Sequence, residues 1–169
     1  MAKWNLDPSH SEVQFKVKHM VISTVTGNFD NFEAMAESNS DDFSDAKFEF
    51  AAHVNTINTK NTDRDNHLKS DDFFAAEKFP EMKFESTSGI QNGKVEGTLE
   101  IRGEKKPITL NADFGGVITD PWGLTRAGFE FSGDINRKDF GLNYKTLHQN
   151  GSAPISKEIK FIANLEFTH

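Results

Sequence analysis

Residues 92–101 read NGKVEGTLEI and residues 127–131 read AGFEF, and in both stretches apolar and polar side chains alternate. A period of two places the apolar side chains on one face of a β-strand and the polar ones on the other. Asn92-Gly93, at the start of the first stretch, is the dipeptide that most strongly predicts a two-residue hairpin. These stretches therefore predict antiparallel strands with one apolar face.

The same alternation recurs through most of the chain. It is clearest in four runs: Val13/Phe15/Val17, Phe48/Phe50/Ala52/Val54, Ile108/Leu110/Ala112/Phe114 and Ile159/Phe161/Ala163/Leu165/Phe167. About eight strands joined mainly by tight turns predict an all-β fold, a single antiparallel β-barrel. No linker or repeat divides the chain, so we expect residues 1–169 to form one domain. Glycines at 27, 97 and 128 predict sharp bends within strands, although Gly128 equally fits close backbone packing. A turn is predicted at residues 103–106.

Residues 61–79 depart from this period and predict a short helical insertion. Thr62 followed by Asp65 is typical of a capping box at the start of a helix. Ser70, followed by two acidic residues, can cap a second short helix that carries Phe73 and Phe74. We therefore expect a helical segment in two pieces, which covers an open end or edge of the sheet.

Phenylalanine dominates the apolar face, with 16 Phe against one Tyr and two Trp. So many rings on one side of a curled sheet indicate either a dense aromatic core or a lined apolar hollow. A barrel of about eight strands can take either form. The absence of cysteine excludes disulfides, thiol catalysis and thiolate metal sites.

The charge balance bears on partners and location. The formal charge is −7, which disfavours binding to the phosphate backbone of nucleic acids. The longest nearly uncharged apolar stretch, residues 20–25, is far too short to span a bilayer. The first residues lack the apolar core of a signal peptide. The expected location is the cytoplasm as the sequence is written, or the periplasm if a leader has been removed.

Candidate metal ligands and catalytic groups are present but form no motif. The six histidines are His10, His19, His53, His67, His148 and His169. None has H-x-H, H-x-x-x-H or H-E-x-x-H spacing, so we predict no metal site. Ser11, His67 and Asp65 could compose a triad, but no G-x-S-x-G motif positions the serine. The enzyme alternative is a small hydrolase or isomerase that uses His10, Asp65 and His67 at the barrel mouth. No catalytic cofactor is expected.

Four segments together resemble one family. They are Asp7-Pro8-Ser9-His10-Ser11, Arg64-Asp65 with His67-Leu68, Gly97-Thr98-Leu99 with Lys106-Pro107-Ile108, and Ile135-Asn136-Arg137-Lys138-Asp139-Phe140-Gly141-Leu142. In this order and at this spacing, the chain is similar to the YceI-like proteins over residues 4–167. The resemblance implies an extended lipocalin-like barrel, a homodimer, and storage or transport of a long isoprenoid lipid such as a polyprenyl lipid or an isoprenoid quinone.

The resemblance also favours the lined hollow over the filled core. The apolar sleeve for such a lipid is then predicted to comprise Phe15, Val17, Phe29, Phe50, Phe84, Leu99, Leu110, Phe114, Phe129 and Phe131. The predicted head-group contacts are His10, Ser11, Arg64, His67 and Arg137. The alternative is structural: Arg64 with Asp65, and Arg137 with Asp139, form internal ion pairs that pin a helix or turn, and His10 bonds a nearby backbone carbonyl. Two further alternatives are a fatty-acid or amide ligand, and a side-chain-filled barrel that serves as a protein-interaction module.

Overall fold

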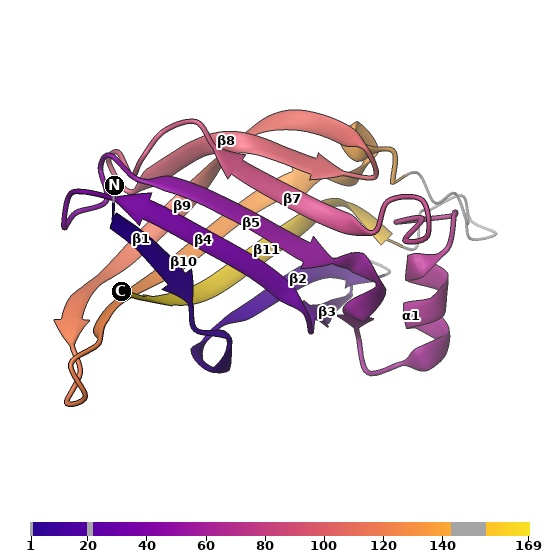
Figure 1. Ribbon diagram of the computed structural model, residues 1–169. Coiled ribbons are helices and arrows are strands. Elements are labelled where there is room, and N and C mark those ends of the chain that lie inside the picture. Colours follow the sequence, from indigo (N-terminus) through magenta and orange to yellow (C-terminus); the bar gives the residue numbers. More distant parts are fainter. Residues whose placement is uncertain (1, 20–21, 143–154) are drawn as a thin grey trace.

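The computed structural model describes residues 2–19, 22–142 and 155–169, and these form a β-barrel with one α-helix at one end (Figure 1). Its strands are β1 (Ala2–Leu6), β2 (Glu12–His19), β3 (Ser23–Phe29), β4 (Phe32–Ser38), β5 (Lys47–His53), β6 (Ile57–Asn58), β7 (Glu81–Ser86), β8 (Lys94–Ile101), β9 (Glu104–Thr119), β10 (Thr125–Asn136) and β11 (Ile155–Thr168). All the pairings between these strands are antiparallel.

Eight strands close the barrel within the described ranges. Their order is β1-β4-β5-β7-β8-β9-β10-β11, and β11 pairs back onto β1. The closing pairs are Asn5↔Thr168 and Leu6↔Phe167. The predicted all-β antiparallel barrel of about eight strands is therefore confirmed.

Three strand connections in the barrel wall are breaks in the regular pairing, and they lie beside one another. The interruptions are η1 (Pro8–His10) between β1 and β2, residues 30–31 between β3 and β4, and η2 (Val54–Thr56) between β5 and β6. The backbone N–H of Asp30 donates to the carbonyl of Thr56 at 3.1 Å, and that of His53 donates to the carbonyl of Asn31 at 3.0 Å. Because η1 separates β1 from β2, β11 pairs with β1 near the C-terminal end of β11 and with β2 along the rest of its length.

The tight turns follow the local sequence. Asn92 and Gly93 have φ values of 54° and 72°, as the predicted hairpin requires. The turn expected at residues 103–106 lies earlier, at Arg102 and Gly103, and β9 begins at Glu104. The pairing between β9 and β10 shifts register at Gly128/Phe129, which marks a β-bulge in the longest hairpin.

The helical insertion is shorter than predicted. Helix α1 (Thr62–Lys69) begins after Asn61, whose side chain accepts from the backbone N–H of Arg64. The prediction of a second helix is wrong, because the segment after Ser70 forms turns. The side chains of four consecutive residues, 73–76, are buried, whereas a helix lying on a barrel buries only one stripe. Within the described residues, no helix combines the length and the apolar character needed to cross a bilayer.

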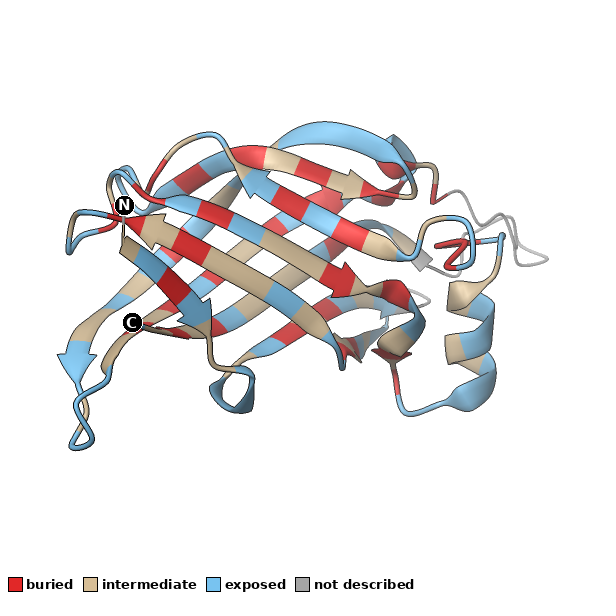
Figure 2. Cartoon of the chain, in the orientation of Figure 1, coloured by how far each residue is buried: buried red, intermediate tan, exposed pale blue. Residues whose placement is uncertain are grey.

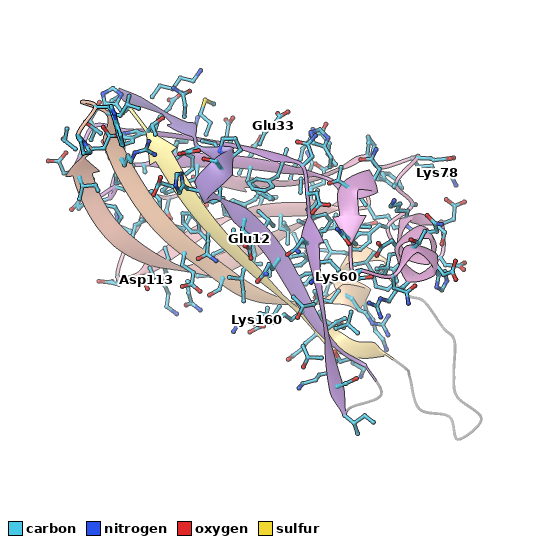
Figure 3. All side chains as sticks on the ribbon, turned by 90° about the horizontal axis from the view of Figure 1, so that it is seen from below. Glu12, Glu33, Lys60, Lys78, Asp113 and Lys160 are labelled. Atoms are coloured by element: carbon cyan, nitrogen blue, oxygen red, sulfur yellow. The ribbon has the colours of Figure 1, made fainter. Side chains whose placement is uncertain are left out.

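Buried and exposed residues alternate along the strands, as the sequence pattern predicted (Figure 2). On β10, Ala127, Phe129 and Phe131 are buried, and Glu130 between the last two is exposed. Charged side chains such as Glu12 and Lys160 project from the outer wall (Figure 3). The apolar side chains therefore meet inside the barrel, where the candidate site lies.

Candidate functional site

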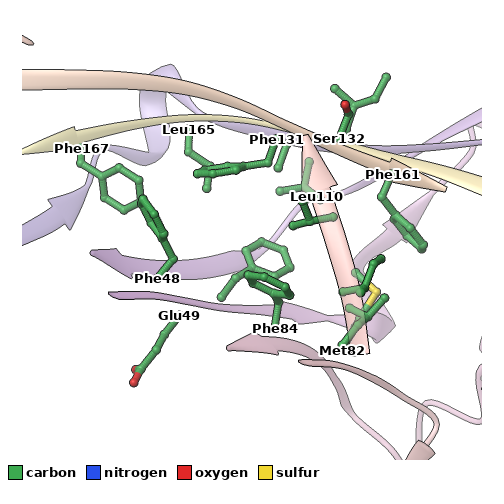
Figure 4. A pocket seen from close by; sticks show the side chains of 17 residues that line it. Phe48, Glu49, Met82, Phe84, Leu110, Phe131, Ser132, Phe161, Leu165 and Phe167 are labelled. Atoms are coloured by element: carbon green, nitrogen blue, oxygen red, sulfur yellow. The ribbon is translucent and has the colours of Figure 1, made fainter. Parts of the chain in front are cut away.

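The barrel interior contains an apolar cavity of about 80 Å³. Side chains from β2, β5, β7, β8, β9, β10 and β11 converge on it (Figure 4). The apolar residues that line it are Val13, Phe48, Phe50, Met82, Phe84, Leu99, Ile108, Leu110, Phe131, Gly133, Phe161, Ile162, Ala163, Leu165 and Phe167. Glu49 also borders the cavity, but its carboxylate points away from the other labelled side chains (Figure 4).

Half of the predicted sleeve lines this cavity, namely Phe50, Phe84, Leu99, Leu110 and Phe131. The other five predicted residues, Phe15, Val17, Phe29, Phe114 and Phe129, pack elsewhere in the core. Ten of the apolar lining residues were not predicted, among them Met82, Gly133 and Phe161. The alternation that places Phe131 inward also places Gly133 and Phe161 inward, because these two residues pair across β10 and β11.

Phenylalanine rings fill the barrel next to the cavity. Phe129 lies at the centre, with ring centroids 4.9 Å from Phe43 and 5.0 Å from Phe114. Trp4 extends the group, 5.3 Å from Phe43. We call Trp4, Phe43, Phe114 and Phe129 the aromatic end. We call Phe50, Met82, Phe84, Leu110 and Phe161 the cavity segment. Phe48, Phe131 and Phe167 contact Phe129 and also line the cavity.

Two glycines leave room for side chains of the cavity segment. A Cβ atom at Gly97 would lie 2.5 Å from Cζ of Phe84, and one at Gly133 would lie 2.6 Å from Cδ2 of Leu110. Both distances are too short for real atoms, so these positions accept Phe84 and Leu110 only because they lack a side chain. The glycines therefore let both side chains lie back against the wall.

The predicted head-group residues His10 and Ser11 lie at η1 on the barrel wall. His10 Nδ1 is 2.8 Å from Asp7 Oδ2. The hydroxyl of Ser11 donates to the carbonyl of Asp7 at 2.7 Å and accepts from the backbone N–H of Glu166 at 3.0 Å. Both side chains thus stabilise the interruption between β1 and β2; the partner of His10 is the Asp7 carboxylate and not the backbone carbonyl of the alternative.

Close to η1, the guanidinium of Arg126 binds three carboxylates from separate segments of the chain. Its guanidinium donates to Asp7 at 2.9 Å, to Asp120 at 2.9 Å and to Glu166 at 2.8 Å. Hydrogen bonds from Ser9, His10 and Arg126 hold the pKa of Asp7 well below its ordinary value. Candidate metal-ligand atoms of Asp7, His10 and Glu166 lie within 4.8 Å of one another. Asp7 and Glu166 already form ion pairs with Arg126, which makes this set less suitable as a metal site.

Arg64 and His67 lie on α1, at the end of the barrel away from the chain termini (Figure 1). Arg64 donates to the hydroxyl of Thr59 at 2.8 Å and to its carbonyl at 2.7 Å. Asp65 accepts from the same hydroxyl at 2.6 Å. His67 Nε2 lies 3.2 Å from Asp72. The contacts with Thr59 fix the helix to the chain segment before it, and the contact with Asp72 links it to the segment after it.

Arg137 is buried, with 3% of its surface exposed. Its guanidinium donates to the backbone carbonyls of Ser156 and Leu142, and burial lowers its pKa. The five predicted head-group residues thus lie in three places: η1, α1 and the turn after β10. His148 and the side chain of His19 fall outside the described residues.

The chain is similar to known proteins over nearly its whole length. Residues 4–167 match the family model for the YceI-like domain. The chain belongs to the YceI-like family. A UPF0312 protein of Staphylococcus aureus is 38% identical over 169 residues, which cover 99% of this chain and 98% of that protein. The crystal structure of a Campylobacter jejuni YCEI protein is 34% identical, with a TM-score of 0.76 and coverage of 100% of this chain and 99% of that one.

A polyisoprenoid binding domain from Saccharophagus degradans has the same fold. Its TM-score is 0.69 over 97% of each chain, at 17% identity. The resemblance drawn from four sequence segments is therefore confirmed for the family, and these YceI-like structures support the fold.

The enzyme alternative finds no support in the geometry of this YceI-like chain. It requires His10, Asp65 and His67 to converge at one mouth. His10 lies in the turn between β1 and β2, whereas Asp65 and His67 lie on α1, and Figure 1 shows these elements apart. His10 is bonded to Asp7 and Asp65 to Thr59. The apolar cavity is the candidate site that remains.

Proposed function

We propose that this YceI-like chain binds the hydrocarbon chain of an isoprenoid lipid, such as a polyprenyl lipid or an isoprenoid quinone, inside the barrel. The observation that carries the proposal is the cavity, whose lining residues on seven strands are all apolar except Glu49 and Ser132. Ser132 lies between the inward positions of Phe131 and Gly133 and so faces outward by alternation. A lining of this kind selects for apolar area and for no particular polar group.

Binding of such a chain requires the cavity to widen. An engineered cavity of about 150 Å³ holds a benzene molecule, and this one measures about 80 Å³. Each CH₂ group that leaves water gains about 0.8 kcal/mol, so a long tail can offset the displacement of a few side chains. Met82 has three rotatable bonds and adapts easily, and Phe50 and Phe161 are only half-buried. We therefore expect ligand entry to move side chains of the cavity segment.

The ligand class has a separate source of support. The Saccharophagus degradans domain of the same fold is described as polyisoprenoid binding. A role as carrier, store or sensor follows from a site that buries a chain without a reactive group beside it. Dimerisation, the head-group contacts and the cellular location stay predictions.

The aromatic end favours a second candidate function. Its rings pack against one another and leave the cavity only part of the barrel. A barrel that its own side chains fill would act as a rigid interaction module instead of a container. The two functions differ in whether lipid enters.

Native mass spectrometry of gently purified protein, followed by organic extraction, tests the first function directly. We expect one lipid per chain, or uptake of an added polyprenol or isoprenoid quinone by the emptied protein. Leu110→Trp should fill the cavity and abolish uptake. Thr109→Trp is the matched control, because the neighbouring side chain is exposed on the outer wall. Wild-type protein that neither carries nor takes up any such lipid would exclude the proposed function.

A further inference from the structure

The tip of the β9–β10 hairpin carries most of the exposed large apolar side chains in the described part of the chain. We define the hairpin tip as residues 117–125. Trp122 is 84% exposed, Ile118 66% and Leu124 44%, and Ile22 in another turn is the fourth such residue. The hairpin tip extends past the barrel end where the two termini lie (Figure 1). An apolar group of this kind on a projecting loop indicates a contact surface.

The hairpin tip has almost no free charge. Its nine residues include one ionisable side chain, Asp120, although 27% of the whole chain is charged. The Asp120 carboxylate accepts from the backbone N–H groups of Trp122 at 2.9 Å and Leu124 at 3.0 Å, and from Arg126 at 2.9 Å. Insertion of the hairpin tip into a less polar medium therefore does not expose an unpaired charge.

The same contacts hold the hairpin tip in one shape. The backbone N–H of Asp120 donates to the carbonyl of Leu124 at 2.8 Å. Arg126 then joins the hairpin tip to Asp7 and Glu166 on the barrel wall. Because Trp122 is presented on an ordered turn, docking costs little conformational entropy.

The size of the apolar group decides between two occupants. A stable interface with a second copy needs about 800 Å² from each partner. A buried aromatic side chain supplies about 150–250 Å², so Trp122 with two partly exposed aliphatic residues falls well short. Insertion into a bilayer needs no such area, and Trp is typical of the membrane–water interface.

We propose that the hairpin tip docks this chain onto the interface of a lipid bilayer, with Trp122 as the inserted residue. The partner is a zwitterionic lipid surface, because the hairpin tip carries no cation to attract anionic lipid, its one carboxylate is paired with Arg126, and the whole chain carries −7. Anionic lipid should weaken the contact by repulsion. The proposal rests on the hairpin alone and holds whether or not the cavity binds an isoprenoid.

Flotation with vesicles of pure phosphatidylcholine tests it. We expect wild-type protein to float with the vesicles, and vesicles that contain phosphatidylglycerol to retain less of it. Trp122→Ser should lower the partition about tenfold, from the loss of one large apolar side chain. Ile22→Ser is the matched control, because Ile22 is 87% exposed in a different turn, and it should leave the partition unchanged.

Fluorescence gives a second readout at the residue itself. Trp122 is exposed, and the only other tryptophan, Trp4, is 6% exposed within the barrel. Brominated phosphatidylcholine should quench the emission of wild-type protein and leave that of Trp122→Ser unquenched. Absence of flotation, equal partition of Trp122→Ser and wild type, or a dimer in sedimentation equilibrium that Trp122→Ser dissociates would each overturn the proposal.

Discussion

The aromatic end and the cavity segment are both built from large apolar side chains, and strand β9 contributes to each, yet one is filled and the other holds a cavity. In the aromatic end, rings face rings: Phe114 and Phe129 pair directly across β9 and β10 and stack at 5.0 Å. In the cavity segment, Phe84 and Leu110 lie against Gly97 and Gly133. In the cavity segment, glycine thus gives Phe84 and Leu110 room to lie against the wall, whereas in the aromatic end another ring occupies the place opposite Phe129.

Phe43→Ala should have the largest effect, because it breaks the aromatic end. Phe43 is fully buried and its ring lies within 5.3 Å of Trp4, Phe114 and Phe129. Its removal should lower the free energy of unfolding by about 3–5 kcal/mol. Urea denaturation followed by circular dichroism measures the change. A loss below 1 kcal/mol would mean that the aromatic end is loosely packed.

Phe161→Ala should cost less, because the same truncation falls in the cavity segment. Phe161 is only half-buried and borders an existing cavity. We expect a loss of about 1–2 kcal/mol in the same urea titration, together with binding of small apolar molecules such as benzene to the enlarged cavity. If Phe161→Ala proves as costly as Phe43→Ala, the two regions do not differ in packing.

Gly133→Ala should change binding more than stability. The new methyl group would push Leu110 from the wall into the cavity. We expect isoprenoid affinity to fall by about tenfold, the equivalent of roughly two methylene contacts, and stability to change by less than about 1.5 kcal/mol. Gly128→Ala on the same strand is the control, because nothing lies within 4 Å of its Cβ position. Equal affinities for the two variants would remove Gly133 from the site.

Asp7→Asn should have the smallest effect on stability, because Asp7 lies at η1, outside both the aromatic end and the cavity segment. Hydrogen bonds from Ser9, His10 and Arg126 lower the pKa of Asp7 in the folded state. The ionised carboxylate therefore stabilises the fold fully above the pKa of the unfolded chain, about 3.9, and this stabilisation is lost as pH falls through the pKa of the folded state. Wild type should be more stable than Asp7→Asn at neutral pH, and the difference should shrink below about pH 4. Urea midpoints measured across this range check it.

Asp41→Asn serves as the control for Asp7→Asn. Asp41 is exposed in the loop between β4 and β5. Its variant should follow wild type at every pH. A constant difference between Asp7→Asn and wild type from neutral to acidic pH would show that the carboxylate charge contributes nothing.

The barrel was predictable from sequence because alternation depends only on neighbours along the chain. The division of its interior was not. Phe84 and Phe129 both look like inward rings, and only register across strands places glycine beside one and Phe114 opposite the other. The prediction of a second helix was wrong for a related reason. Ser70 is a good capping residue, but the tertiary burial of Phe73 and Phe74 overrides that local signal.

The polar predictions show the same limit. The bond between His10 and Asp7 joins residues three apart and could be anticipated from the turn. The contact between Arg126 and Asp7 joins residues 119 apart and depends on closure of the barrel. A list of polar residues therefore cannot distinguish a ligand contact from an internal ion pair until the strand order is known.

The pairing of β1 with β11 also governs how the chain can fold during synthesis. Residues 167–168 close the barrel against residues 5–6, and β11 borders β10 and β2 as well. Until the ribosome releases residues 167–168, the nascent chain can form only an open sheet with two unpaired edges. Such edges invite pairing with other chains, and contacts between residues far apart in the sequence form slowly. A stop codon even slightly upstream of residue 167 should therefore yield aggregated protein, although almost every core side chain has been made.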